Sequence, residues 1–242
     1  MAALVVLGGC GEGEVPTLTI AAAADLSGPS KDLARAFKAE TGTDVVFDLG
    51  SSGQLSQQIE AGAPVDVFMA ADRSYVQGLV DKGLVDASDA DPYARGELVI
   101  WVRDDGPADV DELVDLTDPR VTRIAIANPA HAPYGKAAQQ ALEAAGIWSQ
   151  VQPKLVMGEN VLQALQFAES GNADAAIVAA SVAHGAGGRT GAVPEDTFTP
   201  LIQTLGVLKG STHLAEARTF AEFMRGPEAQ AILATYGFAP AG

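Results

Sequence analysis

The feature that most constrains this chain is a repeated order of short apolar run, small-residue turn and helical stripe. Residues 18–24, 44–49 and 65–70 are apolar runs of strand length, and each is followed by a turn and a segment with helical spacing. Strands that alternate with helices in this way are typical of a parallel sheet covered by helices. The first third of the chain therefore predicts an α/β fold.

The rest of the chain follows the same plan. We predict strands at 98–102, 123–127, 154–157, 175–179 and 201–208, and two closing helices around 214–224 and 227–236. The acidic stretches at 86–91 and 104–105 are interpreted as solvated faces and turns. The expected architecture is two α/β lobes joined by crossing strands, each a mostly parallel sheet flanked by helices. Residues 17–96 plus 203–242 form lobe 1, 97–202 form lobe 2, and 1–16 form a leader and linker.

The negative net charge of the chain restricts the classes of partner that it can bind. Lys plus Arg is 15 and Asp plus Glu is 31, which gives a net charge of −16. Nucleic acids and anionic membrane surfaces are poor partners for such a chain. Any bound anion must therefore be held by local geometry rather than by a basic surface.

Four turns offer that geometry, at residues 24–30, 50–53, 128–135 and 158–161. Each joins the carboxyl end of a strand to a helix start, where ligands of open α/β sheets bind. Unpaired N–H groups and the helix dipole favour a small anion there. Hydroxyl donors are also present in these turns, namely Ser27, Ser51, Ser52 and Tyr134. Two such turns in each lobe, facing across a cleft between the lobes, would enclose a tetrahedral oxyanion; the alternative for any single turn is simple helix capping.

Enzyme motifs are absent from the sequence: it contains no HExxH, no GxSxG and no phosphate-binding GxxxxGK[ST]. We expect no cofactor and no catalytic residue. The alternative from another class is a hydrolase that uses Asp25 and Asp66 as a carboxylate pair, although no activated nucleophile is visible beside them. A cytoplasmic sensory domain is a third alternative, which the N-terminal leader and the lack of a helix-turn-helix segment disfavour.

Several short motifs, in this order and spacing, resemble the molybdate-binding proteins of bacterial ABC importers. The resemblance runs from about residue 18 to 238 and is carried by the motifs at 22–26, 50–53, 58–68 with 71–72, 131–135, 226–230 and 236–238. It implies a two-lobed periplasmic-binding-protein fold of type II that captures molybdate or tungstate and delivers it to a membrane permease. A different oxyanion, including a protonated one, is the alternative.

The resemblance also implies site residues. The family's anion donors match the Ser52 hydroxyl and N–H, the Tyr134 turn and the Val161 N–H. Two positions depart from the family pattern, since Asp25 replaces the usual first-turn serine and Ala179 a common tyrosine, with Ser181 two residues on. Molybdenum is expected only inside the bound oxyanion, without a direct protein ligand.

Asp25 is the unusual member of this set. A carboxylate about 4 Å from one negative charge is repelled by roughly 4 kcal/mol at an effective dielectric constant of 20. Asp25 must therefore turn away, bind in its protonated form, or indicate a different ligand. We expect it to cap the helix, so that only its N–H meets the anion. With an ordinary pKa near 3.9 it would be ionised between about pH 6 and 8, and the affinity would be flat over that range.

The N-terminus carries the single cysteine. The apolar residues before Cys10 end in Leu-Gly-Gly, which resembles a bacterial lipobox, whose cysteine carries lipid after cleavage. We expect a monomer on the periplasmic or extracellular face of the cell membrane, attached only through lipid on Cys10. A leader with an incidental cysteine is the alternative.

Overall fold

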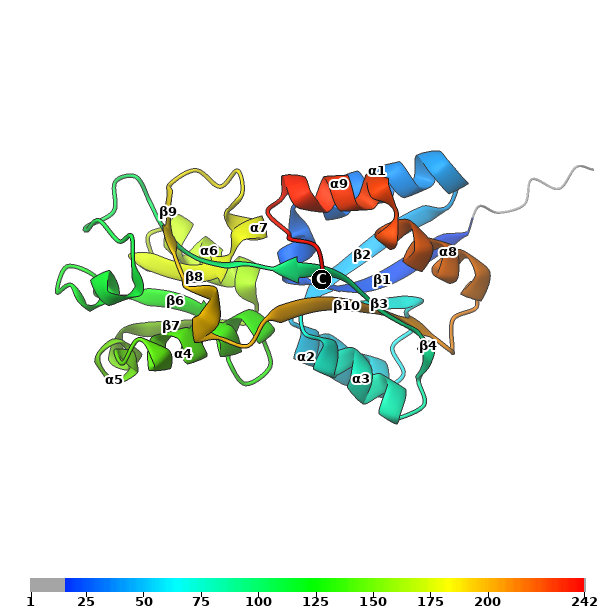
Figure 1. Cartoon of the computed structure of the whole chain (residues 1–242), viewed down its shortest axis with the longest axis horizontal. Helices are drawn as coiled ribbons and strands as arrows, with labels where there is room; N and C mark the ends of the chain where they lie inside the picture. The colour runs from blue at the N-terminus through cyan, green and yellow to red at the C-terminus, as the bar shows by residue number, and fades with distance from the viewer. Residues whose placement is uncertain (1–15, 242) are drawn as a thin grey trace, which may run out of the picture.

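The computed structural model describes residues 16–241, so Cys10 and residues 1–15 of the predicted leader and linker lie outside the described residues. Two five-stranded sheets lie side by side along the long axis of the molecule (Figure 1). The first sheet has the order β2-β1-β3-β10-β4 and the second the order β7-β6-β8-β5-β9. The two-lobed α/β fold predicted from the sequence is confirmed.

The first sheet is built from β1 (Thr17–Ala23), β2 (Asp44–Gly50), β3 (Val67–Ala70), β4 (Val85–Gly96) and β10 (Leu201–Leu208). One face carries α1 (Ser30–Thr41), α8 (Leu214–Arg225) and α9 (Pro227–Thr235), and the other carries α2 (Ser52–Glu60) and α3 (Arg73–Asp81). The side chains alternate accordingly, since Ile20 packs in the first core and its neighbour Ala21 in the second. We call this sheet with its helices the first lobe.

The second sheet is built from β5 (Leu98–Val102), β6 (Ile124–Ala127), β7 (Leu155–Gly158), β8 (Ala175–Ala179) and β9 (Arg189–Ala192). Its helices are α4 (Pro133–Ala144), α5 (Trp148–Val151), α6 (Val161–Glu169) and α7 (Ala180–Ala183). One continuous apolar core joins sheet and helices. We call this unit the second lobe.

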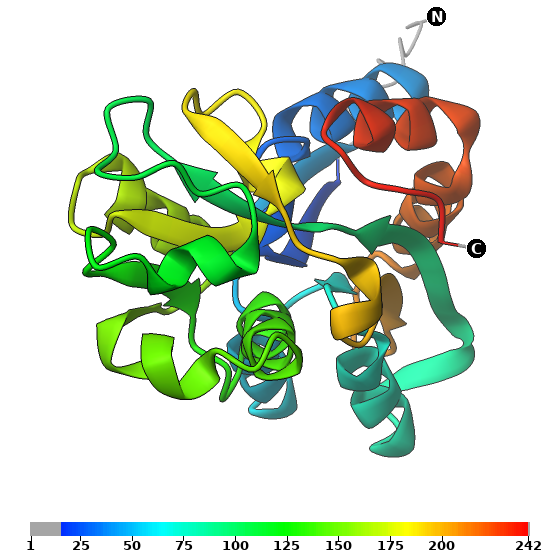
Figure 2. The same cartoon turned by 60° about the vertical axis from the view of Figure 1, so that its left-hand side comes forward.

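Both sheets are mixed rather than mostly parallel. β1 is parallel to β2 and β3, whereas β10 is antiparallel to β3 and β4. In the second sheet β6 is parallel to β7 and β8, whereas β5 is antiparallel to β8 and β9. The chain passes between the lobes twice, from β4 to β5 and from β9 to β10 (Figure 2). The antiparallel pairing arises where these crossing segments join a sheet, and we propose the two crossings as the boundary between the lobes.

The acidic stretch at residues 86–91, which was predicted to be a solvated face or turn, is a strand with partly exposed side chains. It forms most of β4, an edge strand whose carboxylates point outward to cations of nearby elements. Charged side chains are typical of edge strands because they oppose pairing with another chain. The ion pairs, all 2.7–3.0 Å long, are Asp86 with Lys209, Asp89 with Arg218, and Asp91 with Arg225.

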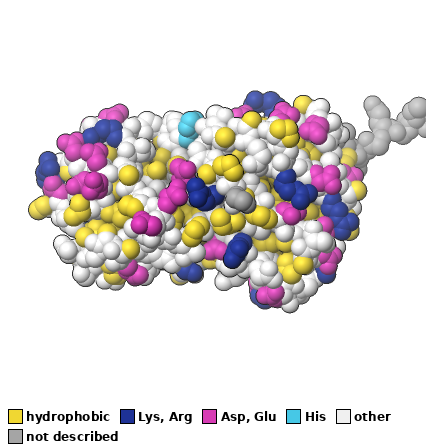
Figure 3. Space-filling view, in the orientation of Figure 1, with side chains coloured by type: hydrophobic (Ala, Val, Ile, Leu, Met, Phe, Trp, Pro, Cys, Tyr) yellow, Lys and Arg dark blue, Asp and Glu magenta, His cyan; other side chains and the backbone are white. Residues whose placement is uncertain are grey.

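Two further observations concern the surface. Over the face seen in Figure 3, basic side chains are interspersed with acidic ones. Within residues 16–241, no helix has the length and apolar character needed to cross a bilayer.

Candidate anion-binding site

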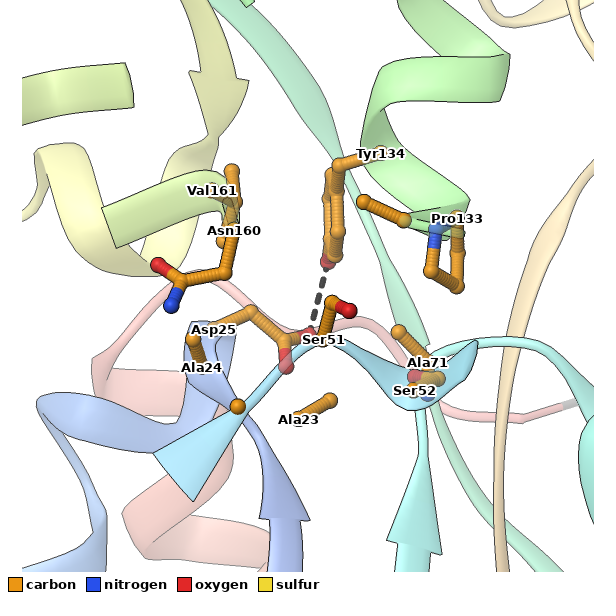
Figure 4. Close-up of a pocket in the computed structure, with 12 residues that line it drawn as sticks. Ala23, Ala24, Asp25, Ser51, Ser52, Ala71, Pro133, Tyr134, Asn160 and Val161 are labelled. Atoms are coloured by element: carbon orange, nitrogen blue, oxygen red, sulfur yellow. Dashed lines mark hydrogen bonds between the residues drawn. The ribbon is translucent and has the colours of Figure 1, made fainter. Parts of the chain in front are cut away.

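All four predicted turns meet at one cavity between the lobes (Figure 4). About 210 Å³ of atom-free space lies here, counting open solvent at the mouth, and about 10 Å³ of it can hold the centre of a water-sized sphere. The first lobe contributes the residues after β1, β2 and β3, and the second lobe those after β6 and β7. The lining consists of Ala23, Ala24, Asp25, Gly50, Ser51, Ser52, Ala71, Ala132, Pro133, Tyr134, Asn160 and Val161.

Local sequence explains why helices begin here. Ser51 and Asn160 are the N-caps of α2 and α6, and their side chains accept hydrogen bonds from Gln54 N and Gln163 N. Pro133 opens α4, where its fixed φ suits the first helical position. The N–H groups of the first helical residues have no acceptor within their own helix. Three helix starts therefore present backbone donors at the cavity.

Ser52 lies in the cavity wall as predicted and is fully buried. Its Oγ accepts a hydrogen bond of 3.0 Å from the N–H of Ala71, the residue after β3. A hydroxyl carries one hydrogen to donate in addition to its acceptor sites. This contact fixes Oγ while leaving that hydrogen for a ligand.

The fully buried Asp25 carboxylate is held by side chains from both lobes. Tyr134 of α4 donates its hydroxyl to Asp25 Oδ2 at 2.9 Å, and Gln203 of β10 donates its Nε2 to the same oxygen at 2.6 Å. Gln203 in turn accepts a hydrogen bond of 3.2 Å from the Tyr93 hydroxyl. Oδ1 has no hydrogen-bond partner within residues 16–241.

Burial changes the acidity of this group. Removal from water raises the pKa of Asp25 from its ordinary value of 3.8 to about 6, and the hydrogen bonds from Tyr134 and Gln203, with smaller contributions from the backbone N–H groups of Asp25 and Leu26, offset only part of that rise. The pKa values of Tyr93 and Tyr134 are raised well above 10, first by burial and then by the nearby Asp25 charge. Both phenols therefore remain neutral donors at neutral pH.

The expectation that Asp25 turns away as a helix cap is wrong. Its side chain lines the cavity and is bound by Tyr134 and Gln203. Tyr134 extends from α4 toward it, as Figure 4 shows. The ordinary pKa assumed for Asp25 is corrected as well, because the sequence could not show how deeply the carboxyl group is buried.

Of the other two predicted site residues, one lines the cavity and one does not. Val161 lines the cavity, whereas Ala179, at the end of β8, is buried and is not part of the lining. Ser181, two residues on, instead donates its hydroxyl to the Asp25 carbonyl at 2.8 Å. The sequence analysis did not identify Gln203 and Tyr93 as residues of the site. Their only sequence signal is a polar side chain within an apolar strand, for Gln203, or shortly before one, for Tyr93.

Asp66 does not join Asp25. Asp66 precedes β3, whereas Asp25 follows the neighbouring parallel strand β1. The two carboxylates therefore lie at opposite ends of these strands. Asp66 accepts hydrogen bonds from Thr19 N at 2.8 Å and Ser211 Oγ at 2.5 Å. The carboxylate pair of the hydrolase alternative is therefore not assembled. No cluster of three or more potential metal ligands occurs in residues 16–241.

The two lobes touch directly at the mouth of the cavity. His131 of the second lobe accepts a hydrogen bond from Gly53 N on its carbonyl at 2.9 Å, and its Nδ1 lies 2.8 Å from Ser51 Oγ. Gln54 donates to Glu159 at 2.7 Å. A Cβ on residue 53 would lie 2.6 Å from the His131 carbonyl oxygen, so only glycine permits this approach.

Two lobes that close over a cavity made of helix starts and hydroxyl groups define a binding protein of the two-lobed kind. The profile of the family described as "Bacterial extracellular solute-binding protein" matches residues 18–239, and the chain belongs to this family. It is a family of solute-binding proteins rather than of enzymes, which agrees with the non-catalytic role expected from the sequence.

Individual relatives are informative. The chain is 37% identical over 219 residues to the molybdate-binding protein ModA of Rhodobacter capsulatus, covering 90% of this chain and 86% of that protein. It is 31% identical over 226 residues to the putative ABC transporter substrate-binding lipoprotein YvgL of Bacillus subtilis, covering 92% and 86%. The solved periplasmic molybdate-binding protein of Azotobacter vinelandii superposes with a TM-score of 0.85 at 31% identity, covering 92% and 98%.

Proposed function

We propose that this chain is the substrate-binding component of an ABC importer, which captures molybdate or tungstate and delivers it to the membrane permease. The observation that carries the proposal is the meeting of four anion-ready turns at one buried cavity. The similarity to three molybdate-binding proteins at 33–37% identity over 90–91% of the chain supports it.

The anion is held by dipoles rather than by cations. The N–H groups of Ser52, Tyr134 and Val161 and the hydroxyl of Ser52 are the donors assigned to it. The Tyr134 hydroxyl is already given to Asp25, so Tyr134 contributes its backbone N–H to the anion. Closure of the lobes buries the anion, and the contacts around His131 hold the closed form.

The protein acts outside the cytoplasmic membrane, in line with its family. Lipid on Cys10 is proposed as its only membrane attachment, supported by the lipobox-like leader and by the lipoprotein relative of Bacillus subtilis. We propose that it acts as a monomer, since one chain supplies both walls of the cavity.

Thermal unfolding with added anions tests the function. A ligand bound only by the native state stabilises by RT ln(1 + [L]/Kd), about 2.7 kcal/mol at a hundredfold excess over Kd. Millimolar molybdate and tungstate should raise Tm, and sulfate should do so much less because its bonds to oxygen are shorter. Unchanged Tm with both metal oxyanions would refute the assignment, and an equal shift with sulfate would remove the claimed selectivity.

Asp25 favours one second candidate, a binding protein for an oxyanion that brings its own proton, such as hydrogen phosphate. The unpartnered Oδ1 would accept that proton. A larger Tm shift with phosphate than with molybdate, at matched concentration and pH, would select this candidate.

A further inference from the structure

We propose that Asp25 determines the charge state of the bound complex, with one proton held between its Oδ1 and an oxygen of the anion. Each captured anion is then accompanied by one proton taken from water, and no covalent bond is made or broken within the anion or the chain beyond that proton transfer. This inference rests on the proposed function, because it concerns the oxyanion in the same cavity.

The two oxygens of Asp25 have different surroundings. Oδ2 accepts from both Tyr134 and Gln203, at 2.9 and 2.6 Å. Oδ1 is buried and has no hydrogen-bond partner in the described chain. A protonated carboxyl group has one oxygen that accepts and one that donates. The arrangement therefore matches a carboxylic acid whose O–H is Oδ1.

The orientation of Gln203 supports this assignment. Gln203 directs its NH₂ group toward Asp25, and its Oε1 accepts a hydrogen bond of 3.2 Å from the Tyr93 hydroxyl. Gly96 makes room for the group, since a Cβ there would overlap the Tyr134 hydroxyl and lie 2.8 Å from Gln203 Nε2. Within residues 16–241, the network thus presents two side-chain donors to Oδ2 and no side-chain donor to Oδ1.

The charged groups near Asp25 offer no compensation for an ionised carboxylate. Tyr134 from α4 and Tyr93 from β4 are the titratable groups that face it. From α7 and α6, Ser181 and Val161 lie nearest the site, and neither is charged.

The remaining neighbours are β2 and the start of α1. β2 reaches the cavity with Gly50, which has no side chain to charge. In the first turn of α1, Lys31 is exposed, and Asp32 is engaged by Arg35 at 3.2 Å and the Tyr236 hydroxyl at 2.8 Å. Within residues 16–241, no ion pair to Asp25 is formed.

A proton removes the conflict between carboxylate and anion. Ionised Asp25 would place an unpaired negative charge against a bound dianion in a buried site, where repulsion is stronger than in bulk water. Protonated Asp25 offers a donor instead, at the position where the family resemblance implies a serine hydroxyl. The same site then binds the anion through one more hydrogen bond.

Titration calorimetry with sodium molybdate tests the inference directly. The heat is measured in buffers of different ionisation enthalpy from pH 6 to 8.5, which gives the number of protons taken up. At pH 8 the wild-type chain should take up about one proton per molybdate, and its Kd should rise about tenfold for each pH unit above the pKa of Asp25. Both quantities, the proton uptake and the pH dependence of Kd, are measured on the wild-type protein and need no variant.

Two substitutions of Asp25 test whether the proton is bound by this residue. Asp25→Asn and Asp25→Ser should bind molybdate with proton uptake near zero and with a Kd that is flat across the range. Proton uptake that persists in both variants would assign the proton to a group other than Asp25 and would overturn the inference.

Failure of this inference is distinguishable from failure of the proposed function. Molybdate binding without proton uptake in the wild-type chain would overturn the role of Asp25 and leave the function intact. Absence of molybdate binding at every pH would overturn both.

Discussion

Replacement of Asp25 by asparagine should stabilise the ligand-free protein at pH 8. The new amide keeps an acceptor oxygen for Tyr134 and Gln203 at the Oδ2 position and places an NH₂ group where Oδ1 now lies without a partner. The variant resembles the protonated carboxyl group but carries no charge at any pH. Its free energy of unfolding should therefore exceed that of the wild type wherever Asp25 is ionised.

The size of the effect follows from the raised pKa. Each pKa unit corresponds to about 1.4 kcal/mol. The rise from 3.8 to about 6 therefore implies that the ionised, buried carboxylate lowers stability by about 3 kcal/mol. Because the native state binds this proton more tightly than the unfolded state, the wild type loses stability as pH rises from about 4 to 6, and the loss is complete above pH 6.

Urea unfolding followed by tryptophan fluorescence at pH 4, 6 and 8 measures the difference between the two proteins. The excess stability of Asp25→Asn should be smallest at pH 4 and reach about 3 kcal/mol at pH 8, equivalent to roughly 6–12 °C in Tm for a chain of this size. Other titrating groups are common to both proteins, so the difference isolates Asp25. An Asp25→Asn protein that is less stable at pH 8, or a difference that does not vary with pH, would refute the reasoning.

Asp66→Asn is the matched control. Asp66 is also buried, but both of its carboxylate oxygens already accept hydrogen bonds, from Thr19 N and Ser211 Oγ. Substitution there replaces an accepting oxygen with a donor, so it should lower stability at pH 8. Opposite signs for the two Asp→Asn changes would show that the unpartnered oxygen, not the loss of a negative charge in general, decides the outcome.

Three further predictions concern binding and anchoring. Ser52→Ala should weaken molybdate binding by about ten- to a hundredfold, as expected for one hydrogen bond to a charged acceptor of roughly 1.5–3 kcal/mol, and calorimetry that finds unchanged affinity would show that Ser52 only supports Ala71. Gly53→Ala should weaken molybdate binding, because its Cβ would lie 2.6 Å from the His131 carbonyl oxygen and oppose the closed contact of the lobes; Gly78→Ala, in open space on α3, is the control that should bind normally. Cys10 should be the lipid-bearing N-terminus of protein purified from membranes, and mass spectrometry that finds it unmodified, or a mature terminus elsewhere, would contradict the anchor.

Much of the fold could be predicted because the apolar runs and the turns between them are local signals. The runs at 18–24 and 175–179 are buried strands, and Gly42 ends α1 in the left-handed conformation that favours glycine. β4 could not be recognised, since its pattern of acidic and small residues becomes a strand only through pairing with β10, which is distant in the sequence. Composition alone suggests a solvated turn for such a segment.

For the site, too, residues with a local sequence signal could be predicted, and residues whose role depends on distant contacts could not. The turns that hold Ser52 and Val161 were found because each joins a strand to a helix start, and the family resemblance then singled out these two residues within them. Gln203 and Tyr93 were not found, because their role depends on three elements that meet around Asp25. The orientation of the Asp25 side chain was predicted wrongly for the same reason: the groups that bind it lie 109 and 178 residues further along the chain.

The hydrogen bond between Asp25 and Tyr134 joins the two lobes, and this has a consequence for unloading. Separation of the lobes would leave Asp25 with the first lobe and Tyr134 with the second, so water would reach the carboxyl group and lower its pKa. A proton held in the closed form is then released into neutral solution, and the ionised carboxylate repels the anion beside it. On the proposed function, opening of the lobes at the permease would thus turn Asp25 from a donor that retains the anion into a charge that expels it.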